Sequence, residues 1–183
     1  FRRVLFRSVY GTVTATHGPG GNSQTTTPVT IDRTLPTISS ITAPANATYG
    51  PASNLDFTVT MSEAVNVTTT GGTPYLALTI GSTSRNATYL SGTGTSTLVF
   101  RYTVQTSASD IDTDGIAMTS PMVLSGGTIA DLAANAITNL GYTAPTLTSV
   151  LVAQVPGAPT ITSIVSGSSQ LTVNFTAGAA NGS

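Results

Sequence analysis

Apolar and polar residues alternate with a period of two along much of this chain. Residues 55–61 read LDFTVTM, and residues 74–80 and 97–104 follow the same rule. Because successive side chains of a strand point to opposite faces, this alternation predicts β-strands with one buried face. The buried side chains are predicted to include Phe57, Val59, Leu76, Leu78, Leu98, Phe100 and Tyr102.

Clusters of Gly, Pro, Asn and Ser separate these segments. Further short strands are predicted at residues 37–42, 64–67, 85–90, 146–152 and, in two pieces, 116–129. Residues 43–53 are predicted to be loop, and residues 129–135 are the one stretch that could form a helical turn. Short strands with turn signals every eight to twelve residues or so are typical of an antiparallel β-sandwich. The connections leave no room for crossover helices, which excludes a parallel α/β fold.

One short sequence motif occurs twice, and it indicates where one β-module is connected to the next. Residues 29–38 read VTIDRTLPTI and residues 150–161 read VLVAQVPGAPTI, so each copy is a strand, a proline-containing link and a new strand. We therefore interpret the chain as a tandem-module fragment. Residues 9–33 are the last strands of a preceding module, residues 34–153 are one complete module, and residues 154–183 are the truncated start of a third.

Residues 1–8, FRRVLFRS, stand apart from this scheme. They back-translate to a string that looks like a common sequencing-library adapter read in frame, and they hold three of the six arginines of a chain without lysine. We interpret them as an adapter artefact and leave them out of the fold, as one would a tag.

Composition narrows the class of protein. Charged residues are 7% of the chain, against about 25% in ordinary globular domains. A chain with so few arginines cannot form the basic face that nucleic-acid binding needs. No apolar run approaches the roughly 18 residues that span a bilayer, so no membrane insertion is expected. The absence of cysteine and the wealth of Thr, Ser, Gly and Asn favour an extracellular bacterial protein, secreted or on the cell surface.

The sequence contains few residues of the types that act in catalysis. His17 is the single histidine and cysteine is absent, so neither a histidine pair for zinc nor a serine-histidine triad is expected. The acids Asp56, Glu63 and Asp131 are the remaining candidates for a carboxylate pair of a glycosidase, and nothing in the sequence pairs them. We expect a non-catalytic protein.

The segment DIDTDGI is the strongest candidate for a binding site. Asp110, Asp112 and Asp114 alternate before Gly115, as in the first half of a calcium loop, and the Ile116 carbonyl could be a further ligand. The twelfth loop position is Pro121 rather than Glu, which excludes an EF-hand. The alternative is a solvated acidic turn whose Asp side chains bond the local backbone.

A weaker candidate lies at the first joint. Asp32 sits in the link between modules and Glu63 follows a core strand, so that loops at the same pole could hold calcium between two modules. The alternative is that both acids are simply solvated or cap the local backbone.

Several motifs resemble known β-modules. Residues 34–38, 57–65, 72–78 and 129–136 together resemble a bacterial immunoglobulin-like repeat. Two positions depart from the pattern of these repeats, since His17 stands where Asp is preferred and Ala134 where Gly is usual.

The tail resembles another module. Residues 155–161 and 171–175 are similar to the opening of a fibronectin type III domain. Together the two resemblances imply an immunoglobulin-like β-sandwich whose partners are neighbouring immunoglobulin-like and fibronectin-like modules of the same chain.

The resemblance implies a function of the spacer class. Such repeats occur in very large surface and secreted bacterial proteins, many of them adhesins, where they present a distal binding domain. The alternative is an accessory module of a secreted polysaccharide-degrading enzyme, acting as a linker or binding glycan or protein through polar loops. The loops at residues 68–74 and 91–94 contain no Trp, which argues against a sugar-binding platform.

Overall fold

The structure is a computed structural model that describes residues 10–13, 29–106 and 110–181. The described part of the chain consists of strands, turns and loops, without helix. Residues 1–8 and His17 lie outside the described residues. The strands are β1 (Tyr10–Val13), β2 (Val29–Asp32), β3 (Ile38–Thr42), β4 (Ala47–Tyr49), β5 (Asn54–Thr68), β6 (Tyr75–Ile80), β7 (Thr83–Ser91), β8 (Thr95–Thr103), β9 (Ala117–Val123), β10 (Thr128–Asp131), β11 (Val150–Val152), β12 (Thr160–Gly167) and β13 (Gln170–Thr176).

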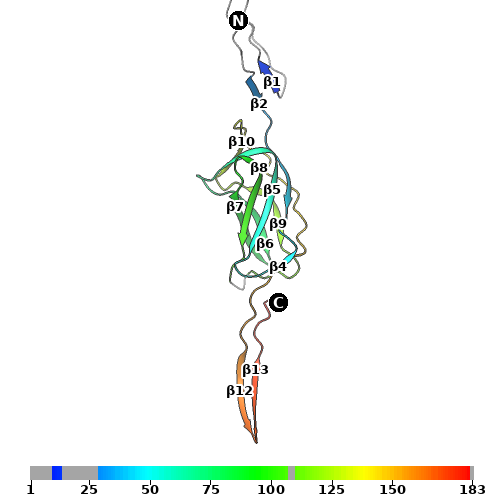
Figure 1. Ribbon diagram of the computed structural model, residues 1–183, viewed down its shortest axis with the longest axis vertical. Coiled ribbons are helices and arrows are strands. Elements are labelled where there is room, and N and C mark those ends of the chain that lie inside the picture. The colour runs from blue at the N-terminus through cyan, green and yellow to red at the C-terminus, as the bar shows by residue number, and fades with distance from the viewer. Residues whose placement is uncertain (1–9, 14–28, 107–109, 182–183) are drawn as a thin grey trace, which may run out of the picture.

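Three bodies follow one another along the long axis in Figure 1. The β1–β2 hairpin lies beyond one end of the central strands, and the β12–β13 hairpin lies beyond the other. The strands β3 to β11 between them are called the central module below. The chain therefore enters and leaves the central module at opposite poles.

An antiparallel sheet dominates the central module. Its strands lie in the order β10-β5-β8-β7-β6-β9, and β3 pairs with β5 in addition. The sheet curls around its apolar face, so the predicted all-β antiparallel class is confirmed. The loop at residues 91–94 connects β7 to β8, and these two strands pair antiparallel.

Strand β5 organises the sheet because it pairs with three others. Its first half lies between β8 and β3, and the pairing with β8 shifts register between Thr60 and Val65. Beyond that irregularity β5 pairs with β10, from Val65 opposite Asp131 to Thr68 opposite Thr128. The sequence predicted two strands here, and the structure has one continuous strand of 15 residues.

The structure differs from the sequence prediction in two segments of the central module. Residues Ala47–Tyr49 form β4, which pairs with β11 in parallel, although the sequence predicted loop at 43–53. The strand is only three residues long, so it has no alternation from which to recognise it. The helical turn considered at 129–135 is not formed, because β10 occupies Thr128–Asp131 and a tight turn with Ala134 at φ 67° follows.

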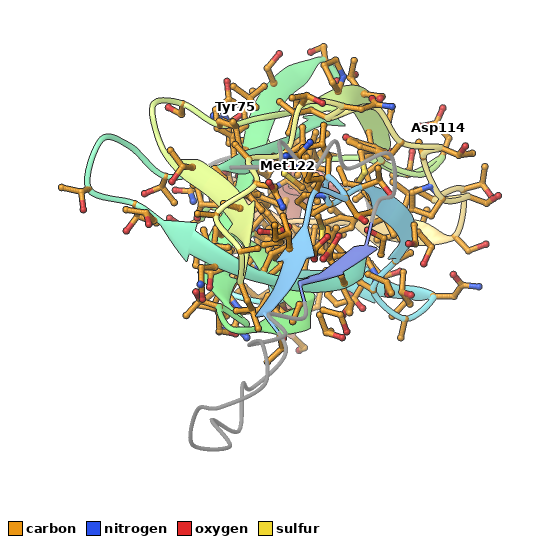
Figure 2. All side chains as sticks on the ribbon, turned by 90° about the horizontal axis from the view of Figure 1, so that it is seen from above. Tyr75, Asp114 and Met122 are labelled. Atoms are coloured by element: carbon orange, nitrogen blue, oxygen red, sulfur yellow. The ribbon has the colours of Figure 1, made fainter. Side chains whose placement is uncertain are left out.

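The core is the concave face of the curled sheet together with β11. All seven predicted core side chains are buried. Met122 of the edge strand β9 points inward, while Asp114 lies at the outer rim (Figure 2). Burial of this continuous apolar cluster provides the main favourable free energy of the fold.

Candidate functional site

Three carboxylates meet where the chain enters the central module. Asp32 ends β2, Glu63 lies at the register shift of β5, and Asp131 ends β10. One oxygen from each lies within 4.8 Å of the others. This cluster is called the acidic joint below, because it links the segment that precedes the module to two strands of the module.

Long-range strand pairing creates the acidic joint. Asp131 lies opposite Val65 in the β5–β10 ladder, two residues from Glu63 along β5. Asp32 is brought in by the link that follows it, in which Thr37 exchanges two hydrogen bonds with Ser62: its amide donates to the Ser62 hydroxyl, and its carbonyl accepts from the Ser62 amide. The link is therefore attached to the residue that precedes Glu63.

Asp131 is held rigidly. It is 2% exposed, and its Oδ1 accepts hydrogen bonds from the amides of Ala133 and Asn135 at 2.8 and 2.7 Å. The Asn135 side-chain amide donates to Asp131 Oδ2 at 2.7 Å and to the Asp32 carbonyl at 3.2 Å. Asn135 thus connects the buried acid of the module to the backbone of the incoming strand.

The electrostatics of the joint differ from acid to acid. Burial raises the pKa of Glu63, and the nearby charges of Asp32 and Asp131 raise it further. Burial also raises the pKa of Asp131, but the hydrogen bonds from Asn135 and Ala133 outweigh it and leave that pKa below its ordinary value. Glu63 is therefore the group whose negative charge is least compensated.

The donor set suits a hard cation. Calcium takes six to eight oxygen ligands at about 2.3–2.6 Å, so two oxygens bound to one ion lie at most about 5 Å apart. The three carboxylate oxygens meet this condition, and each carboxylate has lone pairs beyond those used within the protein. No ion pair with arginine neutralises these acids among the described residues.

In the loop of Asp110, Asp112 and Asp114, predicted as a possible calcium site, two of the three acids accept hydrogen bonds within the protein. The Asp110 side chain is fully buried and accepts hydrogen bonds from Arg85, the Tyr102 hydroxyl and the Gln105 amide. The Asp110 carboxylate therefore points into the protein, where three donors surround it.

Asp112 and its neighbours are engaged in the same way. The Asp112 carboxylate accepts from the amides of Gly81 and Gly115 at 2.7 and 2.8 Å. Asp114 is exposed, and the Ile116 amide donates to the Val150 carbonyl at 3.2 Å. In the structure the three carboxylates do not converge on one point, and the loop is a turn that joins β11 to the module through Asp112 and Val152.

The sequence placed two of the three acids at the joint and missed Asp131. Asp131 and Asn135 both belong to the segment 129–136 that carries the family resemblance, which was a usable signal. A groove of about 520 Å³ between β3 and residues 141–145 is lined by hydroxyl and apolar side chains without a charge.

No family model, curated protein or solved structure matches the chain. Within the described residues, no helix has the length and apolar character needed to cross a membrane.

Proposed function

We propose that the central module is a non-catalytic spacer of a large extracellular bacterial repeat protein of the adhesin type, which presents a distal binding domain. Its partners are the neighbouring immunoglobulin-like and fibronectin-like modules of the same chain. The elongated arrangement supports this function, since the chain enters and leaves the module at opposite poles (Figure 1). The resemblance of the sequence motifs to such repeats supports it as well.

The observation that carries the proposal is the acidic joint. Asp32 belongs to the segment that precedes the module, whereas Glu63 and Asp131 belong to the module itself. A calcium ion bound by all three would cancel their repulsion and fix the direction in which β2 leaves. A spacer needs a stiff joint of this kind, because a free hinge would let a distal domain fold back.

Trypsin cleavage after Arg33 can report whether calcium stiffens the link between β2 and the central module. It is exposed and follows Asp32 at once, so trypsin can cleave the bond to Thr34 when the link opens. In millimolar calcium we expect slower cleavage at Arg33 and a higher melting temperature than in EDTA. At about tenfold excess over a dissociation constant typical of extracellular modules, 10⁻⁴–10⁻³ M, the stabilisation is about 1.4 kcal/mol.

Matched variants identify the site. Glu63→Gln should abolish both calcium effects, because it removes the charge of a ligand that makes no ion pair with the arginines of the described residues. Asp114→Asn, at an exposed acid away from the joint, should keep them. A small peptide substrate controls for the response of trypsin itself to calcium. If wild type and Glu63→Gln respond equally, or neither responds at 10 mM, the calcium joint is wrong.

A further inference from the structure

Residues 153–157 connect the central module to the segment that contains β12 and β13, and they are hydrogen-bonded on both sides. Toward the module, the Ala153 amide donates to the Tyr49 carbonyl of β4 at 3.1 Å. Toward the following segment, the Gly157 amide donates to the Ala179 carbonyl at 2.8 Å. The link is therefore attached to one body at its start and to the other body at its end.

Gln154 lies between these two attachments and contacts both bodies at once. Its side chain is 6% exposed, and its Nε2 donates to the carbonyls of Gln105 and Asp110 at 3.0 and 2.9 Å. A glutamine amide has two N–H donors, so both of them bind the central module. The backbone amide of Gln154 donates to the Asn181 carbonyl of the following segment at 2.9 Å. One residue thus joins the interior of the module to the segment beyond it.

The two carbonyls that Gln154 binds belong to a fixed part of the central module. The Asp110 carboxylate accepts hydrogen bonds from the Gln105 amide at 2.8 Å and from Arg85 at 2.7 Å. A fully buried carboxylate that lost these partners would be strongly destabilising, so the backbone around it is held in place. Gln154 is therefore anchored on the backbone that surrounds the buried ion pair of the module.

On the other side, the following segment folds back onto the link at close range. A Cβ placed on Gly178 would lie 1.8 Å from the Gly157 carbonyl oxygen, so the two backbones can approach only because residue 178 has no side chain. The Asn181 side-chain amide donates to the Val155 carbonyl at 2.7 Å. Between these contacts, the ring of Pro156 fixes its own φ. The link therefore contains no residue that rotates freely.

The following segment contributes no charged group to this joint. From Leu132 to Ser183 the sequence contains no Asp, Glu, Lys, Arg or His. A groove of about 250 Å³ at the joint is lined by uncharged residues, namely Pro51, Thr106, Gln154, Val155 and Asn181. The acidic joint at the opposite pole brings three carboxylates together instead. The two poles of the module are therefore connected to their neighbours by different kinds of interaction.

We propose that the central module and the segment at residues 158–181 form one rigid unit, whose relative orientation is fixed by Gln154 and is independent of calcium. The two joints then respond differently to the removal of calcium: the chain bends at the acidic joint and keeps its direction at this one. The proposal for Gln154 does not require that the acidic joint binds calcium, because no residue of that joint contributes to it.

Two spin labels can measure the relative orientation in the full chain, which has no cysteine of its own. Ala117→Cys provides an exposed attachment point on β9, and Thr172→Cys provides one on β13. Pulsed dipolar electron paramagnetic resonance should give one narrow distance distribution, the same in millimolar calcium and in EDTA. A broad distribution for this labelled chain overturns the proposal, and so does a distribution that changes with calcium.

Two pairs of matched variants identify what fixes the orientation. Gln154→Met removes both side-chain donors and should broaden the distribution, whereas Gln170→Met, the same change at an exposed glutamine of β13, should not. Gly178→Ala introduces the clashing Cβ and should broaden it as well. Its control is Gly167→Ala, whose Cβ would first meet the flexible Gln170 side chain, and which should leave the distribution narrow.

Gly178 lies outside the central module, so its variant keeps the test decisive even if Gln154→Met unfolds the module. The proposal is wrong if Gly178→Ala and Gly167→Ala give distributions of equal width. It is equally wrong if Gln154→Met leaves the module folded and the distribution narrow.

Discussion

The Arg85 guanidinium and the Asp110 carboxylate form an ion pair at 2.7 Å whose acid is completely buried. Tyr102 and the Gln105 amide donate to the same carboxylate. Burial raises the pKa of Asp110, but these donors outweigh it and hold the pKa below its ordinary value. Asp110 is therefore charged at neutral pH, and its stabilising contribution depends on every donor being present.

Arg85→Met should lower the free energy of unfolding by about 3–5 kcal/mol, because it leaves a buried charge without its cation. The control is Arg101→Met, which breaks the exposed pair with Asp56 and should cost under about 1 kcal/mol. Urea denaturation measures both. The pKa of folded Asp110 is depressed, so its contribution is present above the unfolded value and is lost as pH falls through the folded value. Equal costs for the two variants at pH 7 would contradict this account.

The raised pKa of Tyr102 predicts that the free energy of unfolding falls at alkaline pH. Burial, and then its hydrogen bond to Asp110, raise the pKa of Tyr102 to about 12. A raised pKa gives stability that is complete below the unfolded value of about 10 and lost as pH rises through 12. We expect wild type to lose stability between these limits, and Tyr102→Phe to lose less. A part of the loss will remain in that variant, since burial also raises the pKa of Tyr142 to about 12. Denaturation across this pH range provides the test, and identical profiles would contradict the prediction.

The strands could be predicted from the sequence because their signal is local. Alternation over a few residues was enough to identify β6 and β8 and the buried side chains of β5. Strand β4 could not be found this way, because it is three residues long and exists through its pairing with β11.

The candidate site depends on distant pairing, which is why it was predicted only in part. Glu63 and Asp131 meet because β5 pairs with β10. The two acids are far apart in the sequence, and no local pattern indicates which residues of the two strands pair. The spacing of Asp110, Asp112 and Asp114 suggested a cation site, but in the structure Asp110 accepts a hydrogen bond from Arg85 and Asp112 accepts one from Gly81, both distant in the sequence. Local spacing could not reveal those donors.

Ala134 is strained by its backbone. It has a φ of 67°, in the left-handed region where a Cβ costs about 1–2 kcal/mol, and the resemblance places Gly at this position. Ala134→Gly should therefore stabilise the protein by about 1 kcal/mol, less the entropy that glycine loses on folding. The neighbouring Ala133→Gly should not stabilise it, because Ala133 does not have a positive φ. Thermal and urea denaturation compare the two, and a destabilised Ala134→Gly would contradict the argument.

Glu63 should destabilise the calcium-free protein at neutral pH. Its folded pKa is raised by burial and by repulsion from Asp32 and Asp131. A raised pKa means that stability is greatest below the unfolded value and falls as pH rises through the folded value. In EDTA, Glu63→Gln should therefore be more stable than wild type near pH 7, and the difference should shrink toward pH 4. A difference that is constant with pH would indicate that charge repulsion is not the cause.

The β4–β11 pair should resist tension along the chain. The two short strands run parallel, with the Ala47 amide donating to the Ser149 carbonyl and the Ala153 amide donating to the Tyr49 carbonyl, both at 3.1 Å. Strand β4 is near the start of the module and β11 ends it. Once β3 has detached, a pull on the two ends slides β4 and β11 past one another, so that their hydrogen bonds are loaded together.

Force and stability should then respond to different residues. Ala47→Pro removes one of these donors and should lower the unfolding force in single-molecule stretching. Leu98→Ala, in the core and away from this pair, should cost about 2–5 kcal/mol in urea denaturation but lower the force less. This reversed ranking is the expected signature of a module that carries tension through one strand pair. If the force simply follows the free energy of unfolding in both variants, β4 and β11 have no special mechanical role.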